Sequence, residues 1–362
     1  MTSRVAETDE LPTVRVYPAV FDNPYQRLLY SAFSGVANLD LLRRPQLLRR
    51  WGFVRRADVV HFHWEDGTFW GVTSDRVVKR RLKSVMRMLH RHKASGGKLV
   101  WTVHNERPHR ESELHEGFLT IREWLVNEAD MIHVHSAAAR DMLLDQWAPN
   151  PDRIEIVAHP SYQGIYADQA SIQAPQKAPE KARLLFFGSV NAYKGVDTLI
   201  DALCRDGVNG AVSHLTIAGS SVLARRRVIR DAMANVSFGT DLHLNRIPDD
   251  QVAALFQSAE FSVLPYRRSM TSGVAHLAMT FGLPVIAPRL GGMVEALPES
   301  CHTLLYDGDD PNGLPAAIAR AAALTPTDYA RLSADCFAVA ADRAPENQSA
   351  RLIQAMQVRG IL

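Results

Sequence analysis

The densest group of residues able to do chemistry lies in the stretch Leu264–Leu297. Its segment Thr271–Gly273 has the composition of a helix start, because a hydroxyl caps free N–H groups and glycine lets a ligand approach the backbone. A helix N-terminus attracts anions such as a diphosphate. Arg267 and Arg268 precede this start and could supply counter-charge. The stretch predicts an anion site, although an ordinary capped helix would have the same residues.

Strands and helices that alternate along the chain must position this site. An apolar strand begins at Phe261, a helix is expected over 274–281, and the apolar run LPVIAP predicts a buried parallel strand. Gly291 and Gly292 predict a second flexible turn, with Glu295 just inside the next helix. This order brings two loops to the carboxyl ends of neighbouring parallel strands, where open α/β sheets bind ligands.

The stretch resembles the donor-binding region of GT-B glycosyltransferases, which use nucleotide sugars. The large retaining family carries a Glu-x7-Glu pair here, where this sequence has Ser269 and Leu277. The TSGV variant is more similar to bacterial exopolysaccharide enzymes of the xanthan type, which transfer mannosyl or glucuronosyl groups. The resemblance implies an α/β fold of the GT-B class, with two Rossmann-like domains facing a central cleft. The missing acidic pair favours inversion at the anomeric carbon.

Length and composition agree with an enzyme of two domains. The chain has 362 residues, of which 46% are apolar and 22% charged, as in globular proteins. The net charge of +2 does not indicate binding to a polyanion, and no nucleic-acid-binding module is recognisable. Three scattered cysteines indicate reduced thiols in a cytoplasmic protein. No apolar run approaches the roughly 18 residues of a spanning helix, and the polar first residues are unlike a signal peptide.

Composition also divides the chain. Residues 168–181 are rich in Ala, Pro, Gln and Lys, which predicts an interdomain linker. The linker would separate a Rossmann-like acceptor domain, 1–167, from a Rossmann-like nucleotide-sugar domain, 182–343. The resemblance implies that the last helix, within 344–362, crosses back to the first domain.

Carboxylates at strand ends of the first domain are candidate general bases. Asp22 follows the strand predicted over 14–20, in a loop that faces the cleft of a GT-B fold, although it would also serve as a helix cap. Glu65 and Asp66 end the strand that begins at Asp58. A carboxylate at such a place can take the proton of an acceptor hydroxyl that lies within hydrogen-bond reach.

Histidines near strand ends form a second group. Alternation places His61 and His63 on one side of their strand, and this pair could ligate a metal, but no third ligand has suitable spacing. No metal site is therefore predicted. His104 and Glu106 follow the strand predicted over 99–103. The sequence LVWTVHNERPH resembles the GT-B loop that carries a sugar-contacting histidine, and Glu106 is a further candidate base.

Two basic segments lie in the first domain, at 41–51 and 79–93. The second has apolar residues at helical spacing with Lys and Arg filling the other positions. A basic amphipathic helix is typical of contact with an anionic membrane surface, and the alternative is a solvated outer helix. Nucleic acid is not expected as a partner, because the whole chain is almost neutral.

In the second domain, Lys194 follows an apolar strand and resembles the GT-B lysine that contacts the donor diphosphate. The arginine that usually follows the first glycine, Gly188, is Ser189 here, so Arg267 or Arg268 would substitute. Gly219 ends the next strand in a weak phosphate-turn pattern. By resemblance, Arg246 lines the nucleobase pocket and Glu295 meets ribose or sugar hydroxyls.

The resemblance, together with these patterns, implies a hexosyltransferase that moves a hexosyl group from a GDP- or UDP-linked sugar to a glycan acceptor in polysaccharide biosynthesis. The acceptor would be lipid-linked, at the inner face of the cell membrane. The donor is a substrate, and no cofactor is predicted. A sugar-nucleotide epimerase and a non-catalytic sugar-nucleotide-binding subunit remain alternatives. The catalytic candidates are Asp22, Glu65, Asp66, His104 and Glu106. The donor-binding candidates are Gly188, Lys194, Gly219, Arg246, Arg268, Thr271, Ser272, Gly273 and Glu295.

Overall fold

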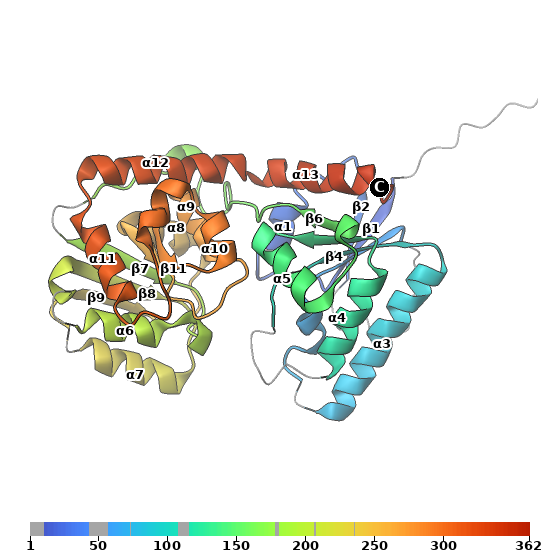
Figure 1. The fold of residues 1–362 in the computed structure, drawn as a ribbon, viewed down its shortest axis with the longest axis horizontal. Coiled ribbons are helices and arrows are strands. Elements are labelled where there is room, and N and C mark those ends of the chain that lie inside the picture. Colours follow the sequence, from blue (N-terminus) through green and yellow to red (C-terminus); the bar gives the residue numbers. More distant parts are fainter. Residues whose placement is uncertain are drawn as a thin grey trace, which may run out of the picture. The chain divides into compact units, whose positions relative to one another are not determined.

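The computed structural model describes residues 11–42, 57–72, 74–107, 116–177, 181–205, 208–234 and 236–362. The chain divides into two compact units (Figure 1). Unit 1 comprises Met1–His135, Arg140–Val157 and Gln348–Leu362, and unit 2 comprises Ser136–Ala139 and Ala158–Asn347.

The unit boundaries differ from the predicted domain boundaries. The long segment of unit 2 begins at Ala158, before the predicted linker, because hydrogen bonds attach the residues after Ala158 to unit 2. The Ser161 N–H donates to the Arg343 carbonyl (2.7 Å), and the Tyr162 N–H donates to Thr280 Oγ1 (3.0 Å). Composition alone does not reveal such contacts. The last residues, Gln348–Leu362, belong to unit 1.

Unit 1 is built on a parallel sheet whose described strands have the order β2-β1-β3-β4-β5-β6. Strands β3 to β5 are buried throughout, apart from the half-buried Lys98, which explains why their sequences are almost continuously apolar. Helices α3 and α4 pack against each other beside the sheet (Figure 1). The strands are β1 (Thr13–Tyr17), β2 (Asn38–Leu41), β3 (Val59–Phe62), β4 (Lys98–Thr102), β5 (Met131–Val134) and β6 (Ile154–Ile156). The helices are α1 (Tyr25–Leu29), α3 (Asp75–Ala94), α4 (Glu116–Glu128), α5 (Ala137–Trp147) and α13 (Pro345–Val358). The first three residues of α5 and of α13 are assigned to unit 2.

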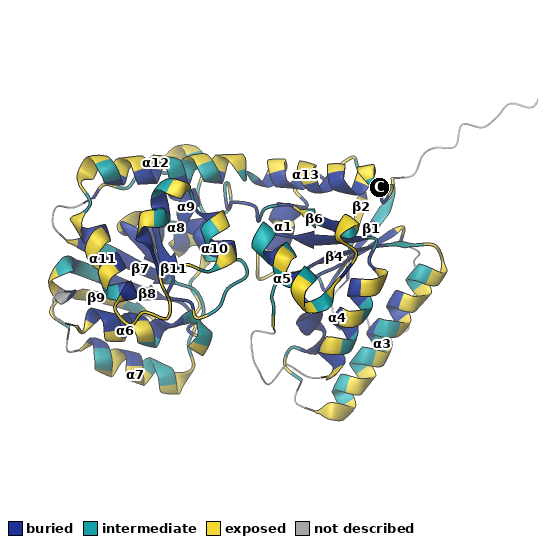
Figure 2. Cartoon of the chain, viewed as in Figure 1, coloured by how far each residue is buried: buried dark blue, intermediate teal, exposed yellow. Residues whose placement is uncertain are grey.

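The end of the chain completes the core of unit 1. Leu352, Ile353 and Met356 of α13 are buried in one cluster with Tyr25 and Leu29 of α1. Figure 2 shows the corresponding buried face of α13. The Ala32 N–H also donates to Ser349 Oγ at 3.0 Å. The last helix is therefore part of this unit's fold.

Unit 2 is a second parallel sheet, with the described strands in the order β12-β11-β10-β7-β8-β9. Helices α6, α7 and α11 lie on one face, and α8, α9 and α12 lie on the other (Figure 1). The strands are β7 (Ala182–Phe187), β8 (Val212–Ala218), β9 (Gly239–His243), β10 (Phe261–Val263), β11 (Val285–Pro288) and β12 (Leu305–Tyr306). The helices are α6 (Val196–Leu203), α7 (Leu223–Met233), α8 (Asp249–Ser258), α9 (Gly273–Thr280), α10 (Gly291–Ala296), α11 (Gly313–Ala323) and α12 (Pro326–Asp342).

Two local predictions need correction. The predicted flexible turn at Gly291 and Gly292 is wrong, because both residues open helix α10. A Cβ on Gly292 would lie 1.8 Å from the Met270 carbonyl oxygen, so this glycine permits close packing rather than a turn. The first predicted strand ends at Tyr17 and not at Val20. Most of the basic segment predicted at 41–51 lies outside the described residues.

Candidate functional site

The helix start predicted in unit 2 is confirmed. Ser272 is the N-cap of α9, and its hydroxyl oxygen accepts a hydrogen bond from the Ala275 N–H at 3.3 Å. Gly273 lets two side chains pack closely against the first turn, since a Cβ there would lie 2.6 Å from the Tyr162 hydroxyl and 3.5 Å from His159 Nε2. The first amides of α9 thus lie beside two polar side chains.

Two cations converge on one aromatic ring, and one of them, Arg268, lies four residues before the N-cap Ser272. The Lys194 ammonium lies 5.2 Å from the Tyr193 ring centroid, and the Arg268 guanidinium carbon lies 5.6 Å from the same centroid. Lys194 also lies 3.6 Å from the ring centroid of Tyr266. Burial lowers the pKa of Lys194. The aromatic rings hold both cations in place. A bound anion would form ion pairs with them.

Glycines let the surrounding loops pack closely. Gly195 has a φ of 67°, and a Cβ there would lie 1.8 Å from the Pro265 carbonyl oxygen, so it fixes the Lys194 loop against the end of β10. Gly219 has a φ of 152°, and its Cβ would lie 1.9 Å from the Gly188 carbonyl oxygen. Gly188 in turn lies beside Val274, with its ideal Cβ position 3.7 Å from Cγ2. The ends of β7, β8 and β10 therefore meet at the start of α9.

Two other residues predicted to bind the sugar donor, Glu295 and Arg246, have different surroundings. Glu295 is an exposed residue of α10, and its carboxylate accepts hydrogen bonds from the Ala137 and Ala138 N–H groups at 2.7 and 2.6 Å. Those residues belong to the same unit, so Glu295 stabilises the start of α5 instead of standing open to a ligand. Arg246 is exposed in the loop between β9 and α8.

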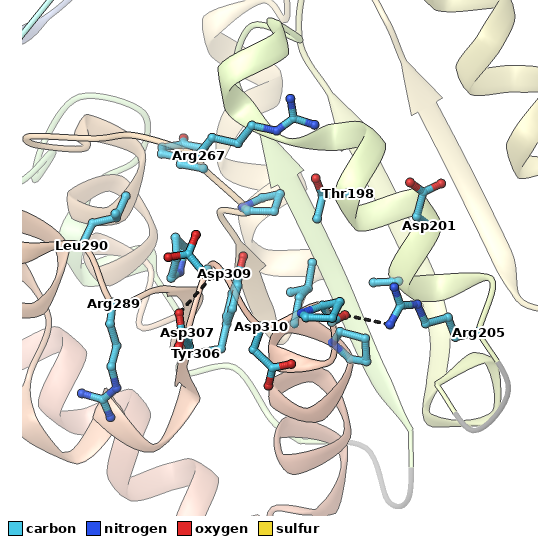
Figure 3. Close-up of a pocket in the computed structure, with 18 residues that line it drawn as sticks. Thr198, Asp201, Arg205, Arg267, Arg289, Leu290, Tyr306, Asp307, Asp309 and Asp310 are labelled. Carbon is cyan, nitrogen blue, oxygen red and sulfur yellow. Dashed lines mark hydrogen bonds between the residues drawn. The ribbon is translucent and has the colours of Figure 1, made fainter.

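Unit 2 also contains a cavity of about 710 Å³ at the carboxyl ends of β10, β11 and β12 (Figure 3). Tyr266 lines it and contacts Lys194 with the same ring, so the cavity adjoins the pair of cations. None of the donor-binding candidates predicted from the sequence lines this cavity, but Arg267, which was expected to supply counter-charge, does. Its charged residues are Asp201, Arg205, Arg267, Arg289, Asp307, Asp309 and Asp310.

In unit 1, Glu65 forms a buried ion pair with Arg122. The Glu65 carboxylate accepts hydrogen bonds from Nε and Nη2 of Arg122 at 2.7 and 2.5 Å, and both side chains are at most 2% exposed. Arg122 also donates to the carbonyl oxygens of Asn105 and Glu106. Glu65 is thereby occupied as a structural partner, which argues against a role as base.

The remaining carboxylates differ in environment. Asp66 is buried in the 3-10 helix Glu65–Phe69 and accepts a hydrogen bond from Trp70 Nε1 at 3.1 Å. Burial raises its pKa, which improves a carboxylate as a proton acceptor. Asp22 is exposed, and Glu106 is half-buried and accepts from Gln146 Nε2 at 3.1 Å.

His104 lies two residues beyond β4 and is 6% exposed. Its ring stacks on Trp64, with centroids 4.0 Å apart. It also belongs to a buried cluster of histidines that includes His133 and His135, which sequence reasoning missed. The second His-x-His pair, at β5 and separated from β3 by β4, was the signal that could have found them. Reasoning from the sequence also missed Tyr193, Tyr266 and Tyr162, because aromatic residues in loops carry no distinctive spacing.

Within the described residues, no three side chains of His, Cys, Asp or Glu are arranged to hold a metal ion. Among the described helices, none combines the length and apolar character that crossing a bilayer requires.

Comparison with known proteins agrees with this architecture. Residues 181–323 match the family model of glycosyl transferases group 1. The chain is 25% identical over 278 residues to GDP-mannose:glycolipid 4-beta-D-mannosyltransferase of Xanthomonas campestris pv. campestris, covering 75% of this chain and 71% of the relative. It is 25% identical over 350 residues to D-inositol 3-phosphate glycosyltransferase of Thermobispora bispora, covering 88% and 75%.

Among solved structures, HepE of Anabaena in complex with UDP and glucose superposes with a TM-score of 0.70 at 12% identity. The match covers 96% of this chain and 100% of HepE. The predictions of the GT-B fold and of a glycosyltransferase enzyme are confirmed. Residues 181–323 thus match the glycosyl transferases group 1 family, and the chain is a glycosyltransferase enzyme with the GT-B fold.

Proposed function

We propose that this glycosyltransferase transfers a hexosyl group from a nucleoside-diphosphate sugar bound by unit 2. The observation that carries the proposal is the convergence of Lys194 and Arg268 on Tyr193, with Arg268 four residues before Ser272, the N-cap of α9. Two cations and a helix N-terminus suit the two negative charges of a diphosphate leaving group. Arg268 supplies the charge that Ser189 lacks, and these groups neutralise the diphosphate without a metal.

The donor is GDP- or UDP-linked. The name of the Xanthomonas relative specifies GDP-mannose and so supports a GDP-linked donor, whereas the complex of HepE with UDP supports a UDP-linked donor. Both nucleotides are therefore included in the test. The predicted nucleobase contact, Arg246, stays part of this proposal.

Unit 1 presents the acceptor, and transfer proceeds with inversion. A carboxylate takes the proton of an acceptor hydroxyl, whose oxygen then bonds to the anomeric carbon as the bond from that carbon to the diphosphate oxygen breaks. Asp66 is the best base among the described acids, since it is buried and its pKa is raised, whereas Glu65 is paired with Arg122. Asp22 and Glu106 are the other candidates.

The acceptor is a lipid-linked glycan of polysaccharide biosynthesis, met at an anionic membrane surface. The support is helix α3, whose only acidic residue is Asp75. Its exposed cations recur at three- and four-residue spacing and so form one stripe along the helix. They are Arg76, Lys79, Arg80, Lys83, Arg87 and Arg91.

The test of transfer is to incubate the purified chain with UDP- and GDP-linked hexoses and a lipid extract of glycan acceptors, and to follow release of nucleoside diphosphate and labelling of the lipid. We expect Asp66→Asn to bind donor normally and to lose transfer. Full transfer by Asp66→Asn, Asp22→Asn and Glu106→Gln alike would overturn the assignment of a base. Free epimerised sugar formed without acceptor would instead favour an epimerase.

The membrane contact is tested by sedimentation with vesicles of anionic or neutral lipids at low salt. The double variant Lys83→Glu, Arg87→Glu should lower binding to anionic vesicles at least about 10-fold, since each cation near such a surface contributes about 1 kcal/mol. The matched control is Arg227→Glu, Arg230→Glu on α7, which is also exposed and basic. Equal loss in both variants, or no binding by the parent protein, would contradict the role of α3.

A further inference from the structure

The cavity of unit 2 offers a ligand site apart from the pair of cations. Its volume of about 710 Å³ lies within the range of about 300–1,000 Å³ that is usual for small-molecule sites. The loops after β10, β11 and β12 line it, and helices α6 and α11 complete it (Figure 3). Open α/β sheets bind ligands at such carboxyl ends of parallel strands. Lys194 and Arg268 lie outside the lining, and the ring of Tyr266 forms a wall between Lys194 and the cavity.

The buried part of the lining is rigid and mostly apolar. Prolines and tyrosines dominate it, and few bonds rotate in these side chains, so contact with a ligand costs them little conformational entropy. Flat apolar surface of this kind suits a pyranose ring, whose faces carry C–H groups and whose hydroxyls lie around its edge. The buried lining residues are Ala202, Pro265, Tyr266, Pro288, Tyr306 and Leu314.

Tyr306 brings a buried hydroxyl to this lining. Its side chain is 7% exposed, and Gly313 lets the ring pack closely against the start of α11, since a Cβ there would lie 3.1 Å from Tyr306 Cδ2. Burial raises the pKa of Tyr306. No hydrogen bond joins its hydroxyl to any residue that the structure describes. Since a buried hydroxyl without a partner is unfavourable, this atom favours a ligand that can hydrogen-bond to it.

Exposed carboxylates form the acidic part of the lining. Oδ1 of Asp307 accepts a hydrogen bond from the Asp309 N–H at 3.0 Å, and Oδ1 of Asp310 accepts from the Asn312 N–H at 2.9 Å. The second oxygen of each carboxylate is left for a ligand. Asp201 and Asp309 form no ion pair within the described part of the chain. Because a carboxylate only accepts, these groups require hydrogen-bond donors from the ligand.

Three arginines supply the opposite kind of group. Nη1 of Arg205 donates to the Pro311 carbonyl at 2.7 Å, which links the end of α6 to the loop after β12. Nη2 of Arg289 donates to the His302 carbonyl at 3.2 Å. Arg267 is exposed, and no described residue accepts a hydrogen bond from its guanidinium. Guanidinium groups only donate, so they require acceptors from the ligand.

This mixture of charges decides the class of ligand. Four carboxylates disfavour a phosphate or another anion, and three guanidinium groups disfavour a metal cation. A sugar hydroxyl both donates and accepts, so its O–H can pair with a carboxylate while its oxygen accepts from a guanidinium. A neutral glycan therefore satisfies both kinds of group and adds no net charge to the cavity.

We propose that this cavity binds a neutral oligosaccharide segment of the glycan that the enzyme extends. Tyr306, Asp201 and Asp309 bind its hydroxyls, while Pro265 and Pro288 contact the faces of its sugar rings. A uronic acid is disfavoured, because its carboxylate would join four others. A glycan held here stays at high effective concentration between turnovers. Its place in the reaction rests on the proposed function, whereas its binding to unit 2 does not.

Binding is tested on the full chain without any donor, by calorimetric titration of neutral and acidic trisaccharides. The neutral probes are cellotriose, maltotriose and mannotriose, and the acidic probe is trigalacturonate. We expect at least one neutral probe to bind, and trigalacturonate to bind at least about 10-fold more weakly, because like charges would meet. Absence of binding by all three neutral probes, or tighter binding of trigalacturonate or of inorganic phosphate, would overturn the proposal.

The place of binding is tested with Thr198→Trp. Thr198 is exposed on α6 and lines the cavity, so a large ring there obstructs the ligand without entering the core. The neutral trisaccharide should bind at least about 10-fold more weakly to this variant. The matched control is Thr327→Trp, an exposed position of α12 outside the lining, which should bind like the parent. Equal affinity of both variants would place the glycan elsewhere.

The role of the carboxylates is tested with the double variant Asp201→Asn, Asp309→Asn. Hydrogen bonds to a charged acceptor are about twice as strong as those between neutral groups, so neutral trisaccharide binding should fall about 10-fold. The control with the same change in charge is Asp249→Asn, Asp250→Asn in the exposed first turn of α8. Equal losses in the two double variants would contradict direct contact between the cavity carboxylates and the glycan.

Titration with UDP and GDP separates this site from the donor site. Thr198→Trp should bind the nucleotide with the affinity of the parent. Loss of nucleotide binding with intact trisaccharide binding would assign the cavity to the donor and overturn the proposal. A parent protein that binds the trisaccharide but neither nucleotide would contradict the proposed function and leave the glycan site standing. With a neutral lipid-linked glycan as acceptor, Thr198→Trp should raise the KM for that acceptor about 10-fold, and an unchanged KM would contradict the assignment to the extended glycan.

Discussion

The guanidinium of Arg122 lies 2.5 Å from the carboxylate of Glu65, and both side chains are almost completely removed from water. Burial of a charge is tolerated here because each partner neutralises the other. We therefore expect Glu65→Gln to destabilise unit 1 by about 3–5 kcal/mol, since it leaves a buried cation without its partner.

Urea unfolding followed by tryptophan fluorescence measures this change. The control is Asp141→Asn, which breaks a pair of similar length, 2.8 Å from Arg140, on exposed side chains. That change should cost less than about 1 kcal/mol. If Glu65→Gln unfolds like the parent protein yet loses transfer, Glu65 is the base after all.

Stability should fall as the pH decreases from about 6.5 towards 4. Burial lowers the pKa of His61 to about 3 and that of His135 to about 4, so in this window the unfolded chain binds protons that the folded chain does not. Each such histidine removes about 1.4 kcal/mol of stability per pH unit.

Nδ1 of His135 hydrogen-bonds to the Val157 carbonyl oxygen at 3.0 Å. The variant His135→Asn tests whether His135 causes the pH dependence, because an amide N–H can replace this donor but does not titrate. Proton uptake on unfolding at pH 5 should be lower by about one proton in the variant. An unchanged uptake would show that His135 is already charged in the folded protein.

Gly219→Ala should destabilise unit 2 by at least about 2 kcal/mol. Its φ of 152° disfavours a side chain, and the added Cβ would lie 1.9 Å from a backbone oxygen that cannot move aside cheaply. The control is Gly210→Ala, where nothing lies within 4 Å of the added atom. Calorimetric midpoints compare the two variants, and equal midpoints would mean that the turn after β8 is not tightly packed.

Local signals in the sequence predicted the elements around α9 well. A continuous apolar run specified β11, and a hydroxyl followed by glycine specified the start of α9, since both depend on neighbouring residues only. The same reasoning predicted a turn at Gly292, because a glycine required for packing against Met270 looks like one required for a turn.

Contacts between distant residues could not be predicted. Glu65 and Arg122 are 57 positions apart, and the link from Glu295 to the start of α5 spans about 158. The buried histidine cluster also depends on strand order and register, which a single sequence does not specify. Those contacts decide which predicted site residues are occupied by protein partners.

The central claim is that Lys194 and Arg268 hold the diphosphate of a nucleotide. The most direct measurement is calorimetric titration of UDP and GDP into the parent protein, Lys194→Met and Arg268→Met, with Arg331→Met of the exposed face of α12 as control. The parent and the control should bind at least one nucleotide equally, and each site variant should bind it about 10-fold or more weakly, since a hydrogen bond to a charged group contributes about 1.5–3 kcal/mol. Binding by both site variants with the affinity of the parent would contradict the claim.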